Sequence, residues 1–100
     1  MRVFVTDEKE MRVLSRQLNQ TGVLRLSTRV EVRGNHLKGK VPVKILYRAY
    51  FIPDEEFWEK DDEYPDEEPY PVTYPNEFLT ESERDEHCKN WYEVLPEDAA

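Results

Sequence analysis

Two histidines and one cysteine are the side chains best suited to catalysis or metal binding in this sequence, and their positions argue against both roles. His36 lies at a predicted turn, whereas His87 and Cys88 are neighbours on a predicted helix. Successive helical residues point about 100° apart, so these two are poor joint ligands, and a zinc site needs two further ligands at suitable spacing. We therefore predict no metal site and no cofactor.

The carboxylates and glycines give no catalytic signature either. Pairs such as Asp61 and Asp62 lie in a dense acidic run, where carboxylates usually stay solvated and ionised. The calcium-loop pattern is absent, and Gly22, Gly34 and Gly39 are too scattered to cradle a phosphate. We predict that the protein is not an enzyme.

Charge is distributed very unevenly along the chain. The 100 residues include 14 Lys and Arg and 22 Asp and Glu, for a net charge of -8. Residues 1–50 hold 11 basic and 4 acidic side chains, whereas residues 51–100 hold 3 basic and 18 acidic ones. Such asymmetry predicts either association between the two halves or two unlike partner surfaces.

Length and composition favour one small cytoplasmic domain. A chain of 100 residues with 38% hydrophobic residues is sufficient for a single modest core. No apolar stretch approaches the ~20 residues that span a bilayer, and the first residues lack the apolar core of a signal peptide. The lone cysteine cannot form an internal disulfide, which fits a reducing compartment. We expect no membrane association.

The N-terminal part predicts a short strand over residues 2–5 and then a helix over residues 7–20. Asp7 followed by Glu10 is a capping-box pattern, and Gly22 is a natural stop. Three apolar residues recur at helical spacing and form the stripe expected to face the core. These residues are Met11, Leu14 and Leu18.

Residues 23–51 then alternate between apolar and polar, which predicts two half-buried strands. Gly34-Asn35 is a two-residue turn signal, so the strands should form a tight hairpin. Pro42 lies on the polar face and lacks an N–H donor, which indicates a sheet edge or a bulge.

The register of that hairpin predicts a basic surface. It places Arg25 opposite Lys44 and Arg29 opposite Lys40, and like charges facing one another destabilise a sheet. We therefore expect this face to meet an anion: nucleic-acid phosphate, an acidic protein, or the acidic half of the same chain. A solvated edge protected against aggregation is the structural alternative. The basic residues are Arg25, Arg29, Arg33, Lys38, Lys40, Lys44 and Arg48.

Residues 53–77 form an acidic, proline-rich connector with 11 acidic residues, one lysine and five of the seven prolines. Proline forbids a long helix there, although Pro53 can begin a short helical turn that carries Phe57 and Trp58 inward. The remainder should be extended and exposed, with aromatic residues spaced among the charges. The predicted partner-binding residues are Trp58, Asp61, Asp62, Tyr64, Asp66, Glu67, Glu68, Pro69, Tyr70, Pro71 and Tyr74.

The C-terminal part predicts a second amphipathic helix over residues 81–94, with a capping box at Thr80–Glu83 and Pro96 as the stop. Its apolar stripe consists of Cys88, Trp91, Tyr92 and Leu95.

The predicted fold class is α+β: a small antiparallel sheet with a long basic hairpin, two amphipathic helices and the acidic connector. The single domain divides into a basic strand-helix-hairpin half (residues 1–52), the acidic proline-rich segment (53–77), the C-terminal helix (78–96) and a tail (97–100).

Three functions remain open for such a chain. Clustered carboxylates with aromatic anchors can compete for Lys and Arg sites that normally bind phosphate, which predicts an inhibitor or modulator of a nucleic-acid machine. The hairpin alternatively predicts a nucleic-acid-binding β-ribbon with an autoinhibitory acidic half, although the net charge of -8 opposes approach to DNA. A structural or adaptor module is the third candidate.

The acidic Tyr-Pro and Glu-Pro run YPDEEPYPVTYP, with the small size and lack of catalytic machinery, resembles small early proteins of lambdoid phages. Among these the chain looks like the Abc-type anti-RecBCD proteins. The resemblance implies non-catalytic binding to the host RecBCD helicase-nuclease in the host cytoplasm, with inhibition or modulation of DNA recombination. Anti-CRISPR and antirestriction inhibitors share this character and remain alternatives.

The X-Pro bonds of the same run suggest a second partner. Such bonds populate the cis form in mobile segments, so the run is a suitable docking strand for a host prolyl isomerase. Rigid spacer prolines are the alternative interpretation.

Overall fold

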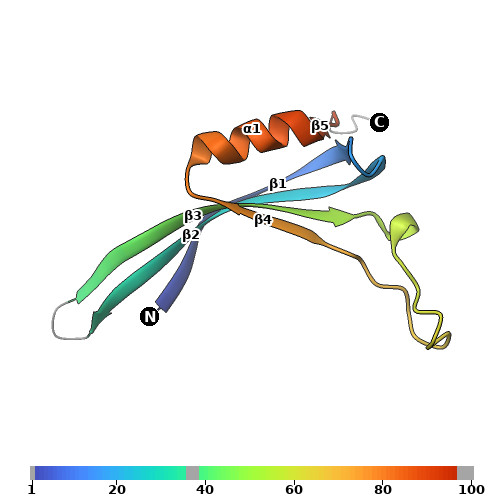
Figure 1. Ribbon diagram of the computed structural model, residues 1–100, viewed down its shortest axis with the longest axis horizontal. Coiled ribbons are helices and arrows are strands. Elements are labelled where there is room, and N and C mark those ends of the chain that lie inside the picture. The colour runs from blue at the N-terminus through green and yellow to red at the C-terminus, as the bar shows by residue number, and fades with distance from the viewer. Residues whose placement is uncertain (1, 36–38, 97–100) are drawn as a thin grey trace.

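A computed structural model describes the backbone of residues 2–35 and 39–96, and the side chains of residues 3–32 and 44–96. This part of the chain forms a five-stranded antiparallel sheet with strand order β4-β3-β2-β1-β5, and one α-helix lies on a face of it (Figure 1). The elements are β1 (Arg2–Ser15), β2 (Gln20–Asn35), β3 (Gly39–Pro53), the 3₁₀ turn η1 (Glu55–Phe57), β4 (Tyr74–Phe78), α1 (Glu81–Trp91) and β5 (Tyr92–Val94).

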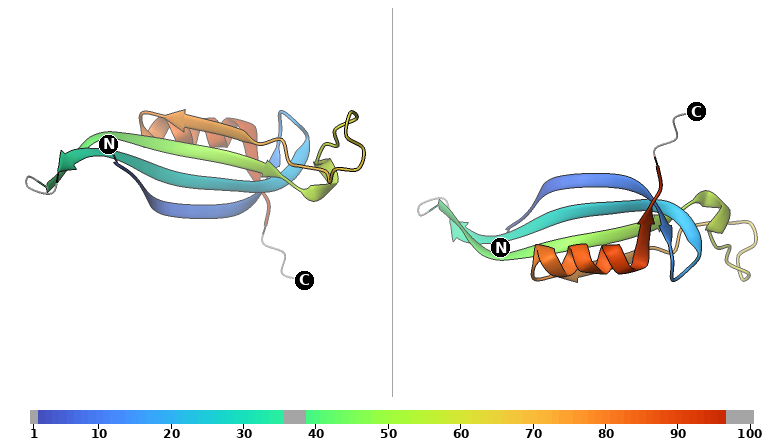
Figure 2. Two further views of the ribbon diagram at one scale, coloured as in Figure 1. Left: turned by 90° about the horizontal axis from the view of Figure 1, so that it is seen from below. Right: turned by 90° about the horizontal axis from the view of Figure 1, so that it is seen from above.

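The molecule is elongated, with principal extents of 52 × 35 × 26 Å. Its radius of gyration is 17.1 Å, compared with about 13 Å for a compact domain of this length. The far end of the β2–β3 hairpin and the segment between β3 and β4 leave the central sheet at opposite ends (Figures 1 and 2). The α+β class is therefore observed, with two projections from a small core.

The helix predicted over residues 7–20 is wrong, because most of this segment belongs to the long strand β1. Val13 and Ser15 are 0% and 3% exposed, so the buried positions repeat every second residue. Asp7, the predicted helix cap, instead has a φ of 51° at a bulge in the pairing with β2. The strand is more stable than the predicted helix because its pairing with β2 buries Val13, whereas a helix would bury only the stripe formed by Met11, Leu14 and Leu18.

A four-residue turn follows β1, and its geometry explains the Asn and Ser at its ends. Asn19 adopts a left-handed φ of 53°, a conformation that asparagine tolerates well. The N–H of Leu18 donates to the Ser15 hydroxyl at 3.3 Å, which gives this buried hydroxyl a partner. Gly22, the predicted helix stop, is a buried residue of β2.

The long hairpin forms between β2 and β3, but the tight turn predicted at Gly34-Asn35 is wrong because β2 continues through both residues. Asn35 pairs with Gly39, and residues 36–38 between them, which include the predicted turn residue His36, lie outside the described residues. The two predicted like-charge pairs therefore do not face each other. The residues that actually lie opposite are Tyr50 for Arg25, Leu46 for Arg29, Glu31 for Lys44 and Gly34 for Lys40.

Both structural roles predicted for Pro42 are confirmed. The register of the hairpin shifts between Glu31 and Val32, and Pro42 lies opposite Val32 at this irregularity. β4 pairs only with residues Tyr47–Phe51 of β3, so the Pro42 stretch lies at the outer edge of the sheet.

The hydrophobic core lies between α1 and the central part of the sheet. Its buried members are Val13, Leu24, Ala49 and Phe51, and the half-buried residues packed against them are Met11, Leu18, Leu26, Phe78, Cys88 and Tyr92. The Phe51 and Tyr92 rings contact each other at a tilt of 31°, with centroids 5.4 Å apart. Apolar residues of all five strands, of the turn after β1 and of α1 therefore meet in one cluster.

The C-terminal helix is shorter than predicted. The Thr80 hydroxyl caps it by accepting the Glu83 N–H at 3.1 Å, as the capping box predicts. The helix ends at Trp91 rather than residue 94, because Tyr92–Val94 pair with the end of β1 as the edge strand β5. Within the described residues, no helix is long and apolar enough to cross a membrane.

Candidate functional site

The segment between β3 and β4, residues 54–73, is the most strongly charged part of the molecule and is called the acidic loop below. It contains ten carboxylates and one lysine. The loop projects from the end of the sheet opposite the far end of the β2–β3 hairpin (Figures 1 and 2). Negative charge is thus gathered on one projection of the molecule.

The base of the acidic loop is fixed to the sheet by Asp54. Both oxygens of this carboxylate accept hydrogen bonds from the Arg12 guanidinium, at 2.6 and 2.9 Å, and the Thr21 hydroxyl donates to it at 2.6 Å. The hydrogen bond from Arg12 is the main reason that the pKa of Asp54 lies below its usual value. Trp58 is half-buried and donates its indole N–H to the Pro53 carbonyl at 2.9 Å. These contacts anchor the loop to β1, β2 and β3.

Backbone hydrogen bonds give the rest of the acidic loop a defined shape. Glu59 and Tyr70 exchange two of them, at 3.0 and 2.9 Å, and thereby close the loop. Inside this closure the Tyr64 N–H donates to the Asp61 carbonyl at 3.2 Å, and the Glu67 N–H donates to the Tyr64 carbonyl at 3.0 Å. The segment predicted to be extended therefore contains consecutive turns.

Most of the predicted partner-binding residues are exposed on this loop. Tyr64 and Tyr70 of the loop are 57% and 46% exposed, and Tyr74, the first residue of β4, is 38% exposed. Asp61 and Pro71 are half-buried, and Trp58 serves as part of the anchor described above. The remaining exposed members are Asp62, Asp66, Glu67, Glu68 and Pro69.

The carboxylates of the acidic loop beyond Asp54 are without basic partners in the described part of the chain. None of the nine between Glu55 and Glu68 forms an ion pair with a described Lys, Arg or His side chain. Their negative potential is therefore directed at solvent, where it attracts positively charged molecules.

By contrast, three of the four residues of the predicted basic surface whose side chains are described are paired within the chain. The Arg25 guanidinium contacts two carboxylates of β1, donating to Glu10 at 2.8 Å and lying 3.2 Å from Glu8. The hydrogen bond to Glu10 is the main cause that raises the pKa of Arg25 above its usual value. Because β1 was expected to be helical there, sequence reasoning missed this contact.

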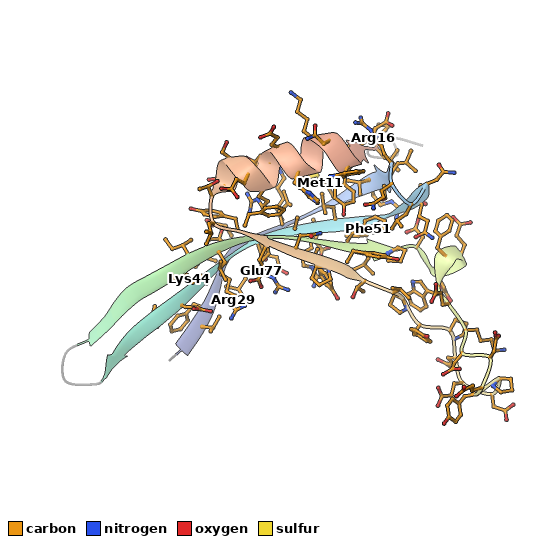
Figure 3. The ribbon with its side chains drawn as sticks, in the orientation of Figure 1. Met11, Arg16, Arg29, Lys44, Phe51 and Glu77 are labelled. Atoms are coloured by element: carbon orange, nitrogen blue, oxygen red, sulfur yellow. The ribbon has the colours of Figure 1, made fainter. Side chains whose placement is uncertain are left out.

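A second ion-pair group joins β2, β3 and β4 on the sheet face opposite α1 (Figure 3). Arg29 contacts Glu31 at 2.9 Å and Glu77 at 3.1 Å, and Arg48 lies 3.3 Å from the same Glu77 oxygen. Glu77 belongs to the acidic segment predicted from the sequence, so one part of the predicted association between the two halves is present. Lys44 is exposed, and the side chains of Arg33, Lys38 and Lys40 lie outside the described residues.

Arg84 on α1 is a buried charge that sequence reasoning did not single out. Its side chain donates to the Ser27 carbonyl at 3.3 Å, and its guanidinium lies 5.6 Å from the centre of the Tyr47 ring. Glu81 and Asp85 flank it at 3.6 and 3.4 Å. The residue fastens the helix to the sheet. It lies four residues before Cys88, so helical spacing places it on the predicted apolar stripe, and this is the signal that could have identified it.

His87 and Cys88 pack against the core rather than forming a reactive pair. Burial raises the pKa of the Cys88 thiol to about 11, so it is not a thiolate near neutral pH. The His87 ring lies 5.1 Å from the Phe78 ring, and its buried Nε2 has no hydrogen-bond partner. Burial lowers the pKa of His87 below its usual value of 6.5, which keeps the imidazole neutral.

This neutral histidine predicts a loss of stability in mild acid. Because the pKa of His87 is lower in the folded than in the unfolded chain, unfolding takes up a proton and becomes more favourable as the pH falls below 6.5. We expect the urea midpoint to decrease between pH 7 and pH 5, and H87F to reduce this decrease. Asp54 contributes only near and below its usual value of 3.8, so it does not mask the effect. Equal slopes for both proteins would contradict the prediction.

Every peptide bond in the described part of the chain is trans, including those before Pro65, Pro69, Pro71 and Pro75. The interaction with a prolyl isomerase stays a prediction.

Comparison with known proteins gives no relative from which a function can be transferred. A scan against protein-family models and searches of curated proteins and of solved structures found no match to this chain. The functional proposal below therefore rests on the chain's own residues.

Proposed function

We propose that this chain is a non-catalytic protein that binds a DNA-processing complex and inhibits or modulates it through the acidic loop. The observation that carries the proposal is the difference between the two charged surfaces. The carboxylates of the acidic loop beyond Asp54 form no ion pair with a described basic side chain, whereas Arg25, Arg29 and Arg48 are paired with carboxylates of the same chain.

The chemistry of the acidic loop fits a surface that normally binds phosphates. Nucleic-acid-binding proteins neutralise phosphates with Lys and Arg, and carboxylates at comparable density can occupy the same side chains. Exposed tyrosines supply the apolar area that fixes a protein interface, and the loop offers Tyr64 and Tyr70 beside its charges. The hydrogen bonds that close the loop reduce the conformational entropy lost on binding.

The resemblance to Abc-type proteins names the first complex to test, a RecBCD-like helicase-nuclease in the cytoplasm of a bacterial host. Anti-CRISPR and antirestriction inhibitors would use the same acidic chemistry on a different target. The alternative of a nucleic-acid-binding ribbon is less well supported, because the pairing of Arg25, Arg29 and Arg48 leaves fewer positive charges for DNA.

Neutralising three loop carboxylates together should weaken binding without unfolding the domain. We expect D66N/E67Q/E68Q to raise the Kd for the helicase-nuclease about 10- to 100-fold, since exposed ion pairs contribute up to about 1 kcal/mol each. The measurement is the Kd for the purified complex together with inhibition of its DNA degradation. The urea midpoint should stay close to that of the unaltered chain, because these side chains are exposed.

A matched control removes the same charge elsewhere. The variant E83Q/E86Q/E93Q changes three exposed carboxylates of α1 and β5 and gives the same net charge. We expect it to bind nearly as well as the unaltered chain. Unchanged inhibition by the loop variant, or an equal loss in both variants, would remove the acidic loop from the mechanism.

A pull-down from host lysate at low and high salt tests the identity of the target. Recovery of a helicase-nuclease that is lost at high salt would support the proposal. Recovery of nucleic acid without a protein partner would favour the β-ribbon function instead.

A further inference from the structure

A cavity of about 290 Å³ lies beside the base of the acidic loop. The turn after β1, the start of β4, the last turns of α1 and the first residue of β5 enclose it. The lining residues on which the argument depends are Gln17, Thr73, Tyr74, Asn76, His87 and Trp91. The size is at the lower end of the range for small-molecule pockets, so the cavity fits a single side chain.

Aromatic rings from three elements line this cavity. Trp91 of α1 and Tyr74 of β4 are 41% and 38% exposed although they line a concave site. The His87 ring lies 6.4 Å from the Trp91 ring and 6.1 Å from the Tyr92 ring. Exposed aromatic surface of this kind loses water favourably when a ligand covers it.

The charges and polar groups of the lining residues determine which ligands the cavity favours. No Lys, Arg, Asp or Glu is among the lining residues, and His87 is neutral near pH 7. The negative faces of aromatic rings attract a cation, whereas they repel a carboxylate or phosphate. The side chains of Gln17, Thr73 and Asn76 each carry an oxygen atom that can accept a hydrogen bond from a cation.

A guanidinium group fits these features better than an ammonium group. It is planar, so it stacks on the faces of tryptophan and tyrosine, and its five N–H donors can reach several acceptors at once. An ammonium group is more strongly hydrated and loses more on entering a partly enclosed aromatic site.

The position of the cavity links it to the acidic loop. Thr73 and Tyr74 connect the loop to β4 and also line the cavity. We propose that the cavity binds the side chain of an arginine from the partner protein while the acidic loop contacts neighbouring basic residues. This inference rests on the proposed function, because it assumes a partner with a basic surface.

The chain's own nearby guanidinium does not fill this role. Arg16 belongs to the turn after β1, and its side chain lies beside the C-terminal end of α1. There it contacts the Lys89 and Asn90 carbonyls at 3.3 and 3.5 Å. It is bound to the helix end and is not among the lining residues.

The proposal can be tested with a small probe and NMR of the full chain. We expect capped arginine amide to produce saturable shifts of the Trp91 indole N–H and the Asn76 side-chain amide. Capped citrulline has nearly the same shape without the charge, so it should bind about tenfold more weakly. The variant W58F assigns the two indole signals of the chain. No saturable shift with arginine, equal binding of citrulline, or tighter binding of capped phenylalanine would overturn the proposal.

Variants separate this inference from the proposed function. W91L should abolish the saturable shifts of the Asn76 amide, and Y74L serves the same purpose if W91L does not fold. The loop variant D66N/E67Q/E68Q should keep arginine binding in the cavity. If the loop variant loses the partner while arginine never binds the cavity, the cavity assignment alone fails. If arginine binds but the loop variant still inhibits fully, the proposed function fails and the guanidinium site stands.

Discussion

Replacement of Phe51 by alanine will lower the free energy of unfolding by about 3–5 kcal/mol, the usual cost of deleting a buried phenylalanine ring. Phe51 is 0% exposed and lies on β3 opposite Leu24 and Tyr74. Its ring also contacts the ring of Tyr92, so it connects the inner strand β3 to the edge strand β5. Only six apolar residues are buried in the described part of the chain, and neighbours on strands cannot easily close the space left by the ring.

Urea denaturation and thermal melting will measure this loss. For a domain of this size each kcal/mol corresponds to about 4–8 °C in Tm, so the F51A variant should be largely unfolded well below the melting point of the unaltered chain. The control is L79A, because Leu79 is 66% exposed and its truncation should change stability by less than about 0.5 kcal/mol. A loss below about 1 kcal/mol for F51A would show that Phe51 does not hold the core together.

The wrong helix near the N-terminus shows how one residue can satisfy two periodicities. Met11 belongs to the helical series that continues at Leu14, and it also begins the alternating series Met11, Val13, Ser15 of the observed strand. The buried serine hides the second pattern, since a polar residue is not expected at a core position. Pairing with β2, which local sequence does not reveal, decides between the two.

The acidic segment was more predictable than the sheet because its properties follow from composition. Dense charge and frequent proline keep a segment exposed whatever it is attached to, and the exposed Tyr64 and Tyr70 agree with that expectation. Its anchor at Asp54 was not predictable, because the partner Arg12 is 42 residues away and was placed on a helix.

The function expected for the basic hairpin depended on the register between its two strands. Because the observed register differs from the predicted one, this expectation changed more than the others. With the predicted tight turn, arginines and lysines faced one another and required an external anion. With the observed register, Arg48 lies opposite Glu77 of β4, and Glu8 and Glu10 reach Arg25 from β1. Predicting which charges pair across a sheet thus requires the order and register of the strands, which a single sequence specifies only weakly. The aromatic cavity, assembled from three separate segments of the chain, was hidden for the same reason.

Replacement of Gly22 by alanine is expected to destabilise the protein strongly, which is the reverse of the usual effect of replacing a glycine in a strand. Alanine normally stabilises a strand interior relative to glycine by about 0.5–1 kcal/mol. At Gly22 a Cβ atom would overlap the backbone carbonyl oxygen of Ile52 and lie 2.9 Å from two carbons of the Phe51 ring. We expect G22A to destabilise the protein by about 3 kcal/mol, at the upper end of the usual cost of overpacking a core. Urea midpoints will check the sign.

A double-mutant cycle between Gly22 and Phe51 separates the two causes of this strain. In the F51A background the ring contact is gone, whereas the contact with the Ile52 carbonyl remains. G22A should therefore cost less in that background but should still destabilise, with a coupling free energy of about 0.5–3 kcal/mol as found for residues in contact. Because F51A alone is strongly destabilised, the cycle is best measured with F51L as well, which keeps part of the side chain. Additive effects, or stabilisation by G22A in the unaltered chain, would show that the glycine is not required for the close approach of β2 and β3.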